Sequence, residues 1–506
     1  MNALRNLPLF LLIMGGGSVS MLAPAIFALS REEFHDARSF FYAALIGVLL
    51  VAMVTITRSG QIKAPTSMSH LQALLACFVL LPLILAVPFF EAVETTSFLS
   101  AYFEMVSCLS TTGLSLFDPG RLSAAEHLWR AQVAWMGGGI IWVAAVAILA
   151  PLSLGGFEVT SRGQPGQPGD LSGYGLERAD QRHRLWRSVA ALLPIYAGLT
   201  VALAVMLKLL GHDWPNAVML AMSTLSTSGV TSQGAVLGGM GIADEAVICC
   251  FLLFGLSRLT FAGDTKAAKS AGIVGDPEFR TGMMIVLVVP TVLMVRHVLG
   301  AYELGEQPGV LATLHGLWGA FFTAMSFLTT TGFVSGDWGT AQAWSGLNTP
   351  DLILMGLAVM GGGVATTAGG VKLLRVVALY LNGRREIEKL IHPSQVVSVA
   401  RSGTRIGRDG IFIAWVFFMM FALSIATICL VLGLVGIAFE PAMVLAVASL
   451  TNTGPLVEMT SSGIDLIGLA AGAKLILCVS MVLGRLEILA IVVILTPEIW
   501  TQVWGK

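Results

Sequence analysis

The sequence predicts an all-α polytopic membrane protein, with two N-terminal helices followed by four pseudo-symmetric repeats of helix, re-entrant loop and helix. Of the 506 residues, 56% are hydrophobic and only 12% are charged, and the mean hydropathy is +0.82, which is too apolar for an ordinary soluble domain. About ten apolar segments have nearly the length needed to cross a bilayer. A cluster of threonine, serine and glycine recurs four times between them.

The composition also argues against several classes of function. The 29 Lys and Arg residues balance the 30 Asp and Glu residues, so no basic excess points to nucleic acid as a partner. The six cysteines lack the spacing of metal ligands and are interpreted as small buried hydrophobes. The chain has no H-E-x-x-H, G-x-S-x-G or G-x-x-x-x-G-K motif. We therefore expect no enzyme and no organic cofactor bound by this chain.

Residues 1–66 are predicted to form two transmembrane helices. The first apolar run extends from Leu7 to Leu29 and the second from Phe40 to Ile56. A cleaved signal peptide is the alternative for the first run. Its apolar core would be roughly 7 to 15 residues long, whereas this run approaches the roughly 20 residues that cross a bilayer.

The four clusters define a repeat. Each lies in a segment too short to span the membrane: "FEMVSCLSTTGLS", "VMLAMSTLSTSGV", "AFFTAMSFLTTTGF" and "VLAVASLTNTGPL". They recur at intervals of roughly 100 to 120 residues, which accommodate two spanning helices, a half-helix and connecting loops. The predicted repeats are 67–157, 186–272, 273–385 and 408–506, joined by cytosolic linkers at 158–185 and 386–407. Predicted spans within them include 245–262 and 350–382.

The distribution of basic residues predicts the orientation. The stretches 211–245 and 303–351, which carry two of the clusters, contain no Lys or Arg, whereas 158–187 is rich in Arg and 383–408 is rich in Arg with one Lys. Because Lys and Arg favour the cytoplasmic side, the clusters are expected to face outward and both termini to lie in the cytoplasm.

Four converging loops of this composition suit a monovalent cation. Backbone carbonyls replace its hydration shell without a countercharge, and glycine permits the positive φ that brings them to an axis. For any single loop, an ordinary helix C-cap explains the pattern equally well, but four matching copies favour a filter around one ion pore. The predicted selectivity-filter residues are Thr111, Thr112, Gly113, Thr227, Ser228, Gly229, Thr330, Thr331, Gly332, Asn452, Thr453 and Gly454.

With these loops, the chain resembles the membrane subunits of the Trk/Ktr/HKT superfamily of cation transporters, in particular the TrkH-like ones. The resemblance covers nearly the whole chain and includes "HLWRAQVAWMGGGIIWVAAVAIL", "MGGGVATTAGGVKLLRV" and "MVLGRLEILAIVVILTPEIW". It implies a potassium-channel-like fold and potassium bound at the filter, because relatives with glycine in all four loops are generally potassium-transporting. Repeat two departs from the family pattern at Val230 and lacks a Gly-Gly pair in its second helix.

The resemblance also implies the surroundings of the protein. These are a bacterial inner membrane, a homodimer with a separate pore in each subunit, and a cytosolic nucleotide-binding regulatory ring of the TrkA type. Secondary transport coupled to sodium or protons, by alternating access, is the rival interpretation. It predicts inverted repeats, whereas the four repeats here have the same sense.

The glycine-rich stretch 360–374 interrupts an apolar span, because each glycine inside a helix costs about 1 kcal/mol relative to alanine. Close helix packing is the alternative. By resemblance it is an intramembrane loop that obstructs the pore, with Arg485 beside it. The alternative for Arg485 is a structural contact with Glu487 or with a carbonyl. The predicted gate residues are Gly361, Gly362, Gly363, Thr366, Thr367, Gly369, Gly370 and Arg485.

Other charged residues receive looser interpretations. Lys372, Arg375 and Lys474 are left unassigned, and extension of the side chain to the cytoplasmic surface is an alternative for the first two. Acidic residues of the outward loops, Glu104 among them, are expected to be solvated and to concentrate cations at a pore mouth.

Overall fold

The computed structural model is almost entirely helical over the residues it describes, which are 8–58, 67–159, 181–237, 240–257, 276–304, 310–339, 351–392, 408–460, 464 and 466–495. Within these ranges, seven helices are long and apolar enough to cross a membrane, or eight if one bent pair counts as a single span. This confirms the predicted all-α polytopic class.

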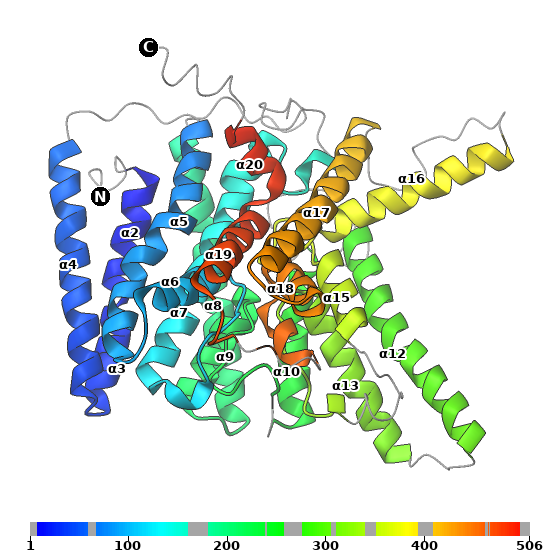
Figure 1. Cartoon of the computed structure of the whole chain (residues 1–506), viewed down its shortest axis with the longest axis horizontal. Helices are drawn as coiled ribbons and strands as arrows, with labels where there is room; N and C mark the ends of the chain where they lie inside the picture. The colour runs from blue at the N-terminus through cyan, green and yellow to red at the C-terminus, as the bar shows by residue number, and fades with distance from the viewer. Residues whose placement is uncertain are drawn as a thin grey trace.

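The N-terminal part forms two antiparallel spans. The first is α2 (Leu9–Ser20) continued by α3 (Leu22–Ser30), and the second is α4 (Phe34–Arg58). They lie at one side of the molecule, where α2 and α4 pack against the first helix of the following part (Figure 1).

After α4, the same order of elements occurs four times. The first helices are α5 (Ser67–Ala92), α8 (Gln181–Leu209), α12 (Pro277–Leu304) and α17 (Arg408–Leu434). The second, shorter helices are α6 (Phe98–Leu109), α9 (Trp214–Ser226), α13 (Val310–Leu328) and α18 (Phe439–Thr451). The third are α7 (Ala124–Ala144), α10 (Ile242–Leu252), α15 (Asp351–Met360) with α16 (Leu373–Ile391), and α19 (Ala471–Leu486) with α20 (Ile488–Leu495).

Short 3-10 or π-helical turns complete the element list. They lie at Pro119–Arg121, Ala145–Leu149, Ala150–Leu152, Phe157–Val159, Leu253–Gly255 and Gly454–Met459.

Two of the predicted spans are not continuous helices. The span at 245–262 is realised as α10, which ends at Leu252 and is followed by one 3-10 turn before the described chain stops at Ser257. The span at 350–382 breaks after α15 and resumes with α16, leaving the segment 361–372 without helix, here called the glycine-rich loop. Gly361 and Gly370 have φ of 72° and 74°, which an α-helix does not allow.

A second break separates α19 from α20, whose axes differ by 97°. Glu487 occupies the bend with φ 66°. The fourth repeat therefore also ends in a broken helix, although its sequence is a continuous apolar segment.

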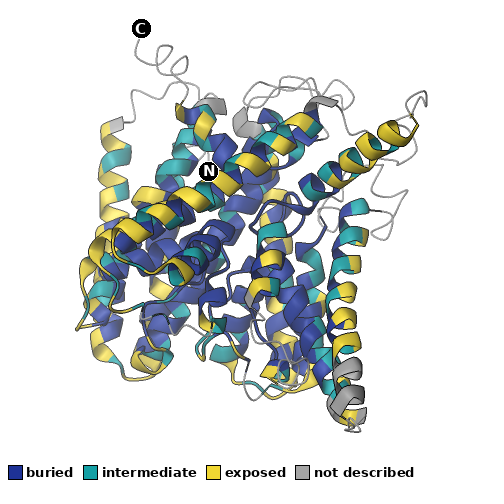
Figure 2. Cartoon of the chain, turned by 45° about the vertical axis from the view of Figure 1, so that its right-hand side comes forward, coloured by how far each residue is buried: buried dark blue, intermediate teal, exposed yellow. Residues whose placement is uncertain are grey.

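The predicted linkers fall largely on 160–180 and 393–407, which lie outside the described residues. Two residues assigned to the first linker, Glu158 and Val159, are buried in the helical body instead. In place of the start of the second linker, α16 continues to Ile391 and projects from the body (Figures 1 and 2).

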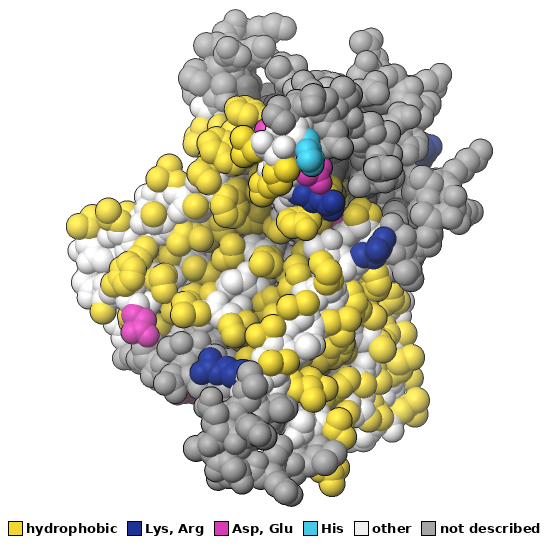
Figure 3. Space-filling model, turned by 90° about the vertical axis from the view of Figure 1, so that its right-hand side faces the viewer, with side chains coloured by type: hydrophobic (Ala, Val, Ile, Leu, Met, Phe, Trp, Pro, Cys, Tyr) yellow, Lys and Arg dark blue, Asp and Glu magenta, His cyan; other side chains and the backbone are white. Residues whose placement is uncertain are grey.

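Burial places the core around the short second helices, and the outer helices show apolar side chains to the exterior (Figure 2). On α12 the exposed residues include Met284, Leu287, Val288, Val292 and Val295. The face carrying this helix is broadly hydrophobic, with few charged side chains among its described residues (Figure 3). Such a surface suits lipid rather than water.

Candidate ion-conducting site

Each short second helix ends in the same backbone motif. One residue at the end of each helix has a left-handed backbone conformation. The φ angles are 55° at Thr111, 51° at Thr227, 58° at Thr330 and 55° at Asn452. The next N–H donates to the carbonyl five residues earlier, at 2.8 Å (Thr112 to Ser107), 3.1 Å (Ser228 to Ser223), 2.9 Å (Thr331 to Ser326) and 2.9 Å (Thr453 to Ala448). This is the Schellman helix cap. The C-cap interpretation of a single loop is therefore correct for the backbone, and the same cap is used four times.

The glycine that follows each cap touches the next loop in sequence order. A Cβ on Gly113 would stand 1.9 Å from the Ser228 carbonyl oxygen, and one on Gly229 would stand 2.2 Å from that of Thr331. On Gly332 it would stand 2.9 Å from Pro455, in the fourth loop. The shortest of these contacts follow the order one, two, three, four, and a Cβ on Gly229 would also stand 2.5 Å from Pro455, which therefore reaches both the second and the third loop.

The ring closes between the fourth loop and the first. A Cβ on Gly454 would stand 2.2 Å from the Leu114 nitrogen, and the Gly454 N–H donates to the Thr112 carbonyl at 2.6 Å. The structure thus brings all the predicted filter residues together. We call the residues 111–113, 227–229, 330–332 and 452–454 the four-loop ring.

A hydrogen bond between two hydroxyl groups also recurs in all four loops. In each loop, the hydroxyl of the residue before the left-handed position forms a hydrogen bond with the hydroxyl of the residue after that position. The pairs are Ser110 and Thr112 at 2.7 Å, Ser226 and Ser228 at 3.0 Å, Thr329 and Thr331 at 3.1 Å, and Thr451 and Thr453 at 3.2 Å. The filter residues predicted from the sequence do not include the first member of each pair. Its recurrence as serine or threonine in all four clusters was the available signal.

The chemistry of the ring is that of neutral oxygen ligands. Its side chains are buried and uncharged, and its polar groups are carbonyl and hydroxyl oxygens together with the carboxamide of Asn452, whose Nδ2 donates to the Thr112 hydroxyl at 2.9 Å. In the part of the chain that the structure describes, no group of three or more His, Cys, Asp or Glu could hold a metal ion. The arrangement therefore suits a weakly held monovalent cation better than a tightly chelated metal.

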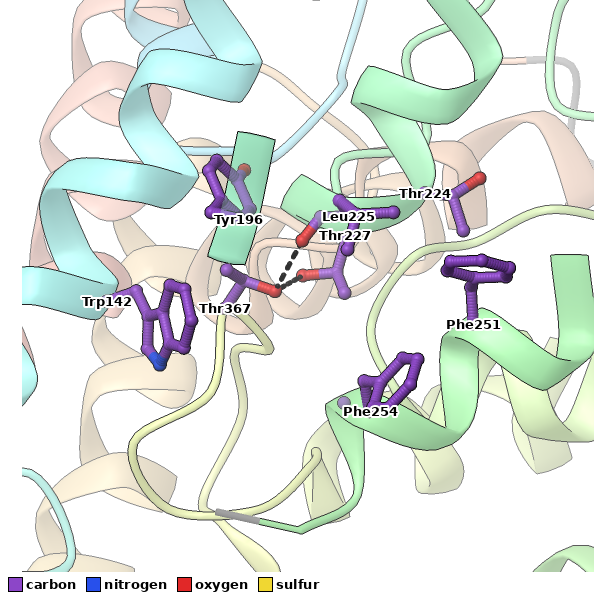
Figure 4. Close-up of a pocket in the computed structure, with 9 residues that line it drawn as sticks. Trp142, Tyr196, Thr224, Leu225, Thr227, Phe251, Phe254 and Thr367 are labelled. Atoms are coloured by element: carbon purple, nitrogen blue, oxygen red, sulfur yellow. Dashed lines mark hydrogen bonds between the residues drawn. The ribbon is translucent and has the colours of Figure 1, made fainter. Parts of the chain in front are cut away.

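The glycine-rich loop lies directly against the ring. Thr367 donates its hydroxyl hydrogen bond to the Leu225 carbonyl at 3.1 Å and accepts one from the Thr227 hydroxyl at 3.1 Å (Figure 4). The Gly369 N–H donates to the Thr330 hydroxyl at 2.7 Å. Beside these contacts is a small pocket lined by Trp142, Tyr196, Thr224, Leu225, Thr227, Phe251, Phe254, Gly255 and Thr367 (Figure 4).

Arg485 contacts this loop. Its Nη1 donates to the Thr367 carbonyl at 2.7 Å, and its side chain is buried. Of the two structural contacts considered for Arg485, the structure therefore shows the one with a carbonyl and not the one with Glu487. Of the other predicted gate residues, Gly363 donates to the Gly255 carbonyl and Thr366 to the Gly363 carbonyl. Gly362, like Gly361 and Gly370, packs too closely on neighbouring backbone or side chain to accept a Cβ.

The surface alternative is wrong for both Arg375 and Lys372. Arg375 does not extend to the surface: it is fully buried and forms ion pairs of 2.6 Å with both Glu158 and Glu487. Lys372 is buried too, and its ammonium donates to the Ala368 carbonyl. The reason is that α16 begins at the glycine-rich loop, so its first turn lies inside the protein.

Glu104 also departs from expectation, because it is buried and paired with Arg130 at 2.7 Å instead of being solvated. The unassigned Lys474 donates to the Ser100 hydroxyl at 3.2 Å, at the start of α6. The charged residues inside the apolar segments were visible in the sequence, but their partners were not.

Comparison with known proteins identifies the family of this chain. The model of the TrkH family, described as cation transport protein, matches residues 280–501. The chain is 32% identical to the Trk system potassium uptake protein TrkH of Halomonas elongata, over 79% of each protein. It is 30% identical to TrkH of Vibrio parahaemolyticus, over 96% of each.

The fold agrees as well. The crystal structure of the potassium transporter TrkH from Vibrio parahaemolyticus superposes with a TM-score of 0.81 and 26% identity, covering 99% of this chain and 100% of that one. The resemblance inferred from the sequence is confirmed, and it is to transporters and not to enzymes. The chain belongs to the TrkH family of cation transport proteins.

Proposed function

We propose that this protein takes up potassium across the bacterial inner membrane, with the four-loop ring as its selectivity filter. The observation that carries the proposal is the closed order of contacts, in which each glycine touches the next loop and the fourth touches the first. The relatives named as potassium uptake proteins support the choice of ion.

The physical argument is one of ligand strength. A potassium ion loses its water at such a ring if several carbonyl and hydroxyl oxygens replace it, and neutral ligands release it again because no countercharge holds it. The helix caps fix the start of each loop, and the hydrogen bonds between hydroxyl groups fix the residues on either side of the left-handed position. Potassium at the residues of the ring is then the transported substrate.

The glycine-rich loop and Arg485 form the gate in this proposal. Three contacts support it: Thr367 and Gly369 lie on the threonines of the ring, and Arg485 holds the Thr367 carbonyl. A guanidinium near the path of a cation repels it strongly where the dielectric is low. Opening requires the loop to leave these contacts, and glycine makes its backbone free to do so.

The proposal includes the surroundings expected from the sequence. These are a homodimer with one pore in each subunit, a cytosolic nucleotide-binding regulator of the TrkA type, outward-facing clusters and cytoplasmic termini. The projecting charged half of α16 is an accessible surface for such a regulator, with Arg384, Glu386 and Lys389 exposed.

The test of ion choice uses purified protein in liposomes. Reversal potentials under separate potassium and sodium gradients, repeated with a pH gradient, measure selectivity and coupling independently. A potential that follows the potassium gradient alone supports a selective pore. A potential that shifts with the proton or sodium gradient favours the rival coupled transporter.

The test of the gate compares Arg485→Ala with Arg384→Ala, an exposed arginine on α16. Rubidium uptake without a regulator should increase in the first variant and stay unchanged in the second. An equal or lower uptake in folded Arg485→Ala protein argues against a gate at this arginine.

A further inference from the structure

Three carboxylates hold the chain just beyond the four-loop ring. Each accepts a hydrogen bond from a backbone N–H that follows a ring glycine: Glu104 from Leu116 at 3.1 Å, Glu458 from Ala235 at 2.8 Å, and Glu245 from Gly336 at 2.9 Å. The segments held in this way follow the first, second and third loops. A carboxylate bond to a backbone N–H is charge-assisted and stronger than a neutral one.

Glu245 makes the most contacts of the three. Besides the Gly336 N–H, its carboxylate accepts from the indole of Trp318 at 2.8 Å and from the hydroxyl of Ser335 at 2.8 Å. Its residue is only 2% exposed. It therefore joins α10 of repeat two to the short helix α13 and the post-ring segment of repeat three.

Glu104 is committed in a similar way within repeat one. One oxygen binds Arg130 and the other binds the Leu116 N–H, and the residue is fully buried. A carboxylate that concentrates cations at a pore mouth needs contact with solvent. The negative charge of Glu104 and Glu245 is instead directed at donors of the protein itself.

The post-ring segments of repeats two and three are also joined to each other. Leu237 donates to the Val334 carbonyl at 2.9 Å, and Val334 donates to the Ala235 carbonyl at 3.0 Å. Glu245 and Glu458 thus hold the two sides of one paired segment.

We propose that Glu245 is a positioning residue that sets the ion preference of the ring, with Glu104 in the same role for repeat one. This rests on the proposed function of the ring as a filter. Loops one, two and three are each fixed at their start by the helix cap and just beyond their end by a carboxylate. A loop held at both ends cannot contract around a smaller ion, so its carbonyls favour the larger potassium over sodium.

The decisive variant is Glu245→Gln. An amide keeps the size but has one accepting oxygen, so its NH2 group faces either the Gly336 N–H or the Trp318 indole N–H. We expect the potassium-to-sodium permeability ratio to fall by about three- to tenfold, the factor that corresponds to the net contribution of one ordinary hydrogen bond. Trp318→Phe removes the indole N–H donor and keeps an aromatic side chain, so it should lower the permeability ratio less.

The matched control is Glu440→Gln, an exposed acid in the first turn of α18, which should leave the ratio unchanged. Reversal potentials in liposomes are measured at low and high ionic strength. If Glu245→Gln lowers flux only at low ionic strength and keeps the ratio, the residue acts as a mouth charge and the proposal fails.

Three further outcomes keep the test decisive. If Glu245→Gln does not fold, an unchanged ratio in both Trp318→Phe and Ser335→Ala overturns the proposal. If the wild-type protein itself shows no potassium preference, the proposed filter fails, and this positioning role fails with it. A potassium-selective wild type with unaltered variants refutes the positioning role alone.

Discussion

Replacing Arg375 by methionine should destabilise the protein severely. The guanidinium lies between two carboxylates, 2.6 Å from an oxygen of Glu158 and 2.6 Å from one of Glu487, and also donates to the Val371 carbonyl at 3.1 Å. Its planar group stacks 3.6 Å above the ring of Phe417. One buried side chain therefore ties the end of repeat one, the start of α16, the helix α17 and the bend between α19 and α20.

The size of the effect follows from what is left behind. Methionine preserves the packing on Phe417, but both carboxylates then remain buried without their cation. Breaking a buried ion pair from one side costs about 3–5 kcal/mol, most of it the penalty of the uncompensated charge. Removing that charge should reverse much of the loss, so the triple variant Arg375→Met, Glu158→Gln, Glu487→Gln should recover most of the stability.

Thermal unfolding of the detergent-solubilised protein measures this. The control is Arg384→Met, whose ion pair with Glu388 is exposed on both sides and contributes at most about 1 kcal/mol. A melting temperature for Arg375→Met equal to that of the control would refute the buried triad. So would a triple variant that is less stable than the single one.

Three other predictions follow from the same geometry. Gly332→Ser should reduce potassium preference in reversal-potential measurements, because φ is 81° and a Cβ would stand 2.9 Å from the proline of loop four. An unchanged ratio would remove repeat three from the filter. An impermeant thiol reagent should label Gln233→Cys from outside and Leu390→Cys from the cytoplasm, both being exposed, and the reverse pattern would invert the topology. Gly137→Ala should lower thermal stability, since its Cβ would stand 1.9 Å from a carbonyl of α6, whereas Gly198→Ala meets nothing within 4 Å and should not.

The repeats and the ring could be predicted because their signals are local in sequence. The caps of the short helices depend on residues within about one and a half turns of helix. The same is true of the break at Gly361, where the density of glycine alone argues against a helix. Four copies of such a local pattern then identify a common site without any knowledge of contacts.

The charged contacts could not be predicted because their partners are distant in sequence. Arg375 lies 217 residues from Glu158 and 112 from Glu487, and nothing in the local pattern selects these pairs. The sequence does mark a charge within an apolar segment as costly, which is why Arg485 was considered. It does not show whether such a charge reaches the surface or finds a partner, so the role of Arg375 stays open at the level of the sequence.

The contacts between loop and ring also bear on how separate the proposed gate and filter are. Thr367 bonds to the Thr227 hydroxyl and Gly369 to the Thr330 hydroxyl, so the loop cannot move without releasing side chains of the ring in repeats two and three. Each such hydrogen bond contributes only about 1 kcal/mol net, since water or a neighbouring group replaces it. A regulator can therefore displace the loop at modest cost. Because the helix caps and hydroxyl pairs of the ring do not involve the loop, its removal should leave the carbonyl positions, and hence the ion preference, largely in place.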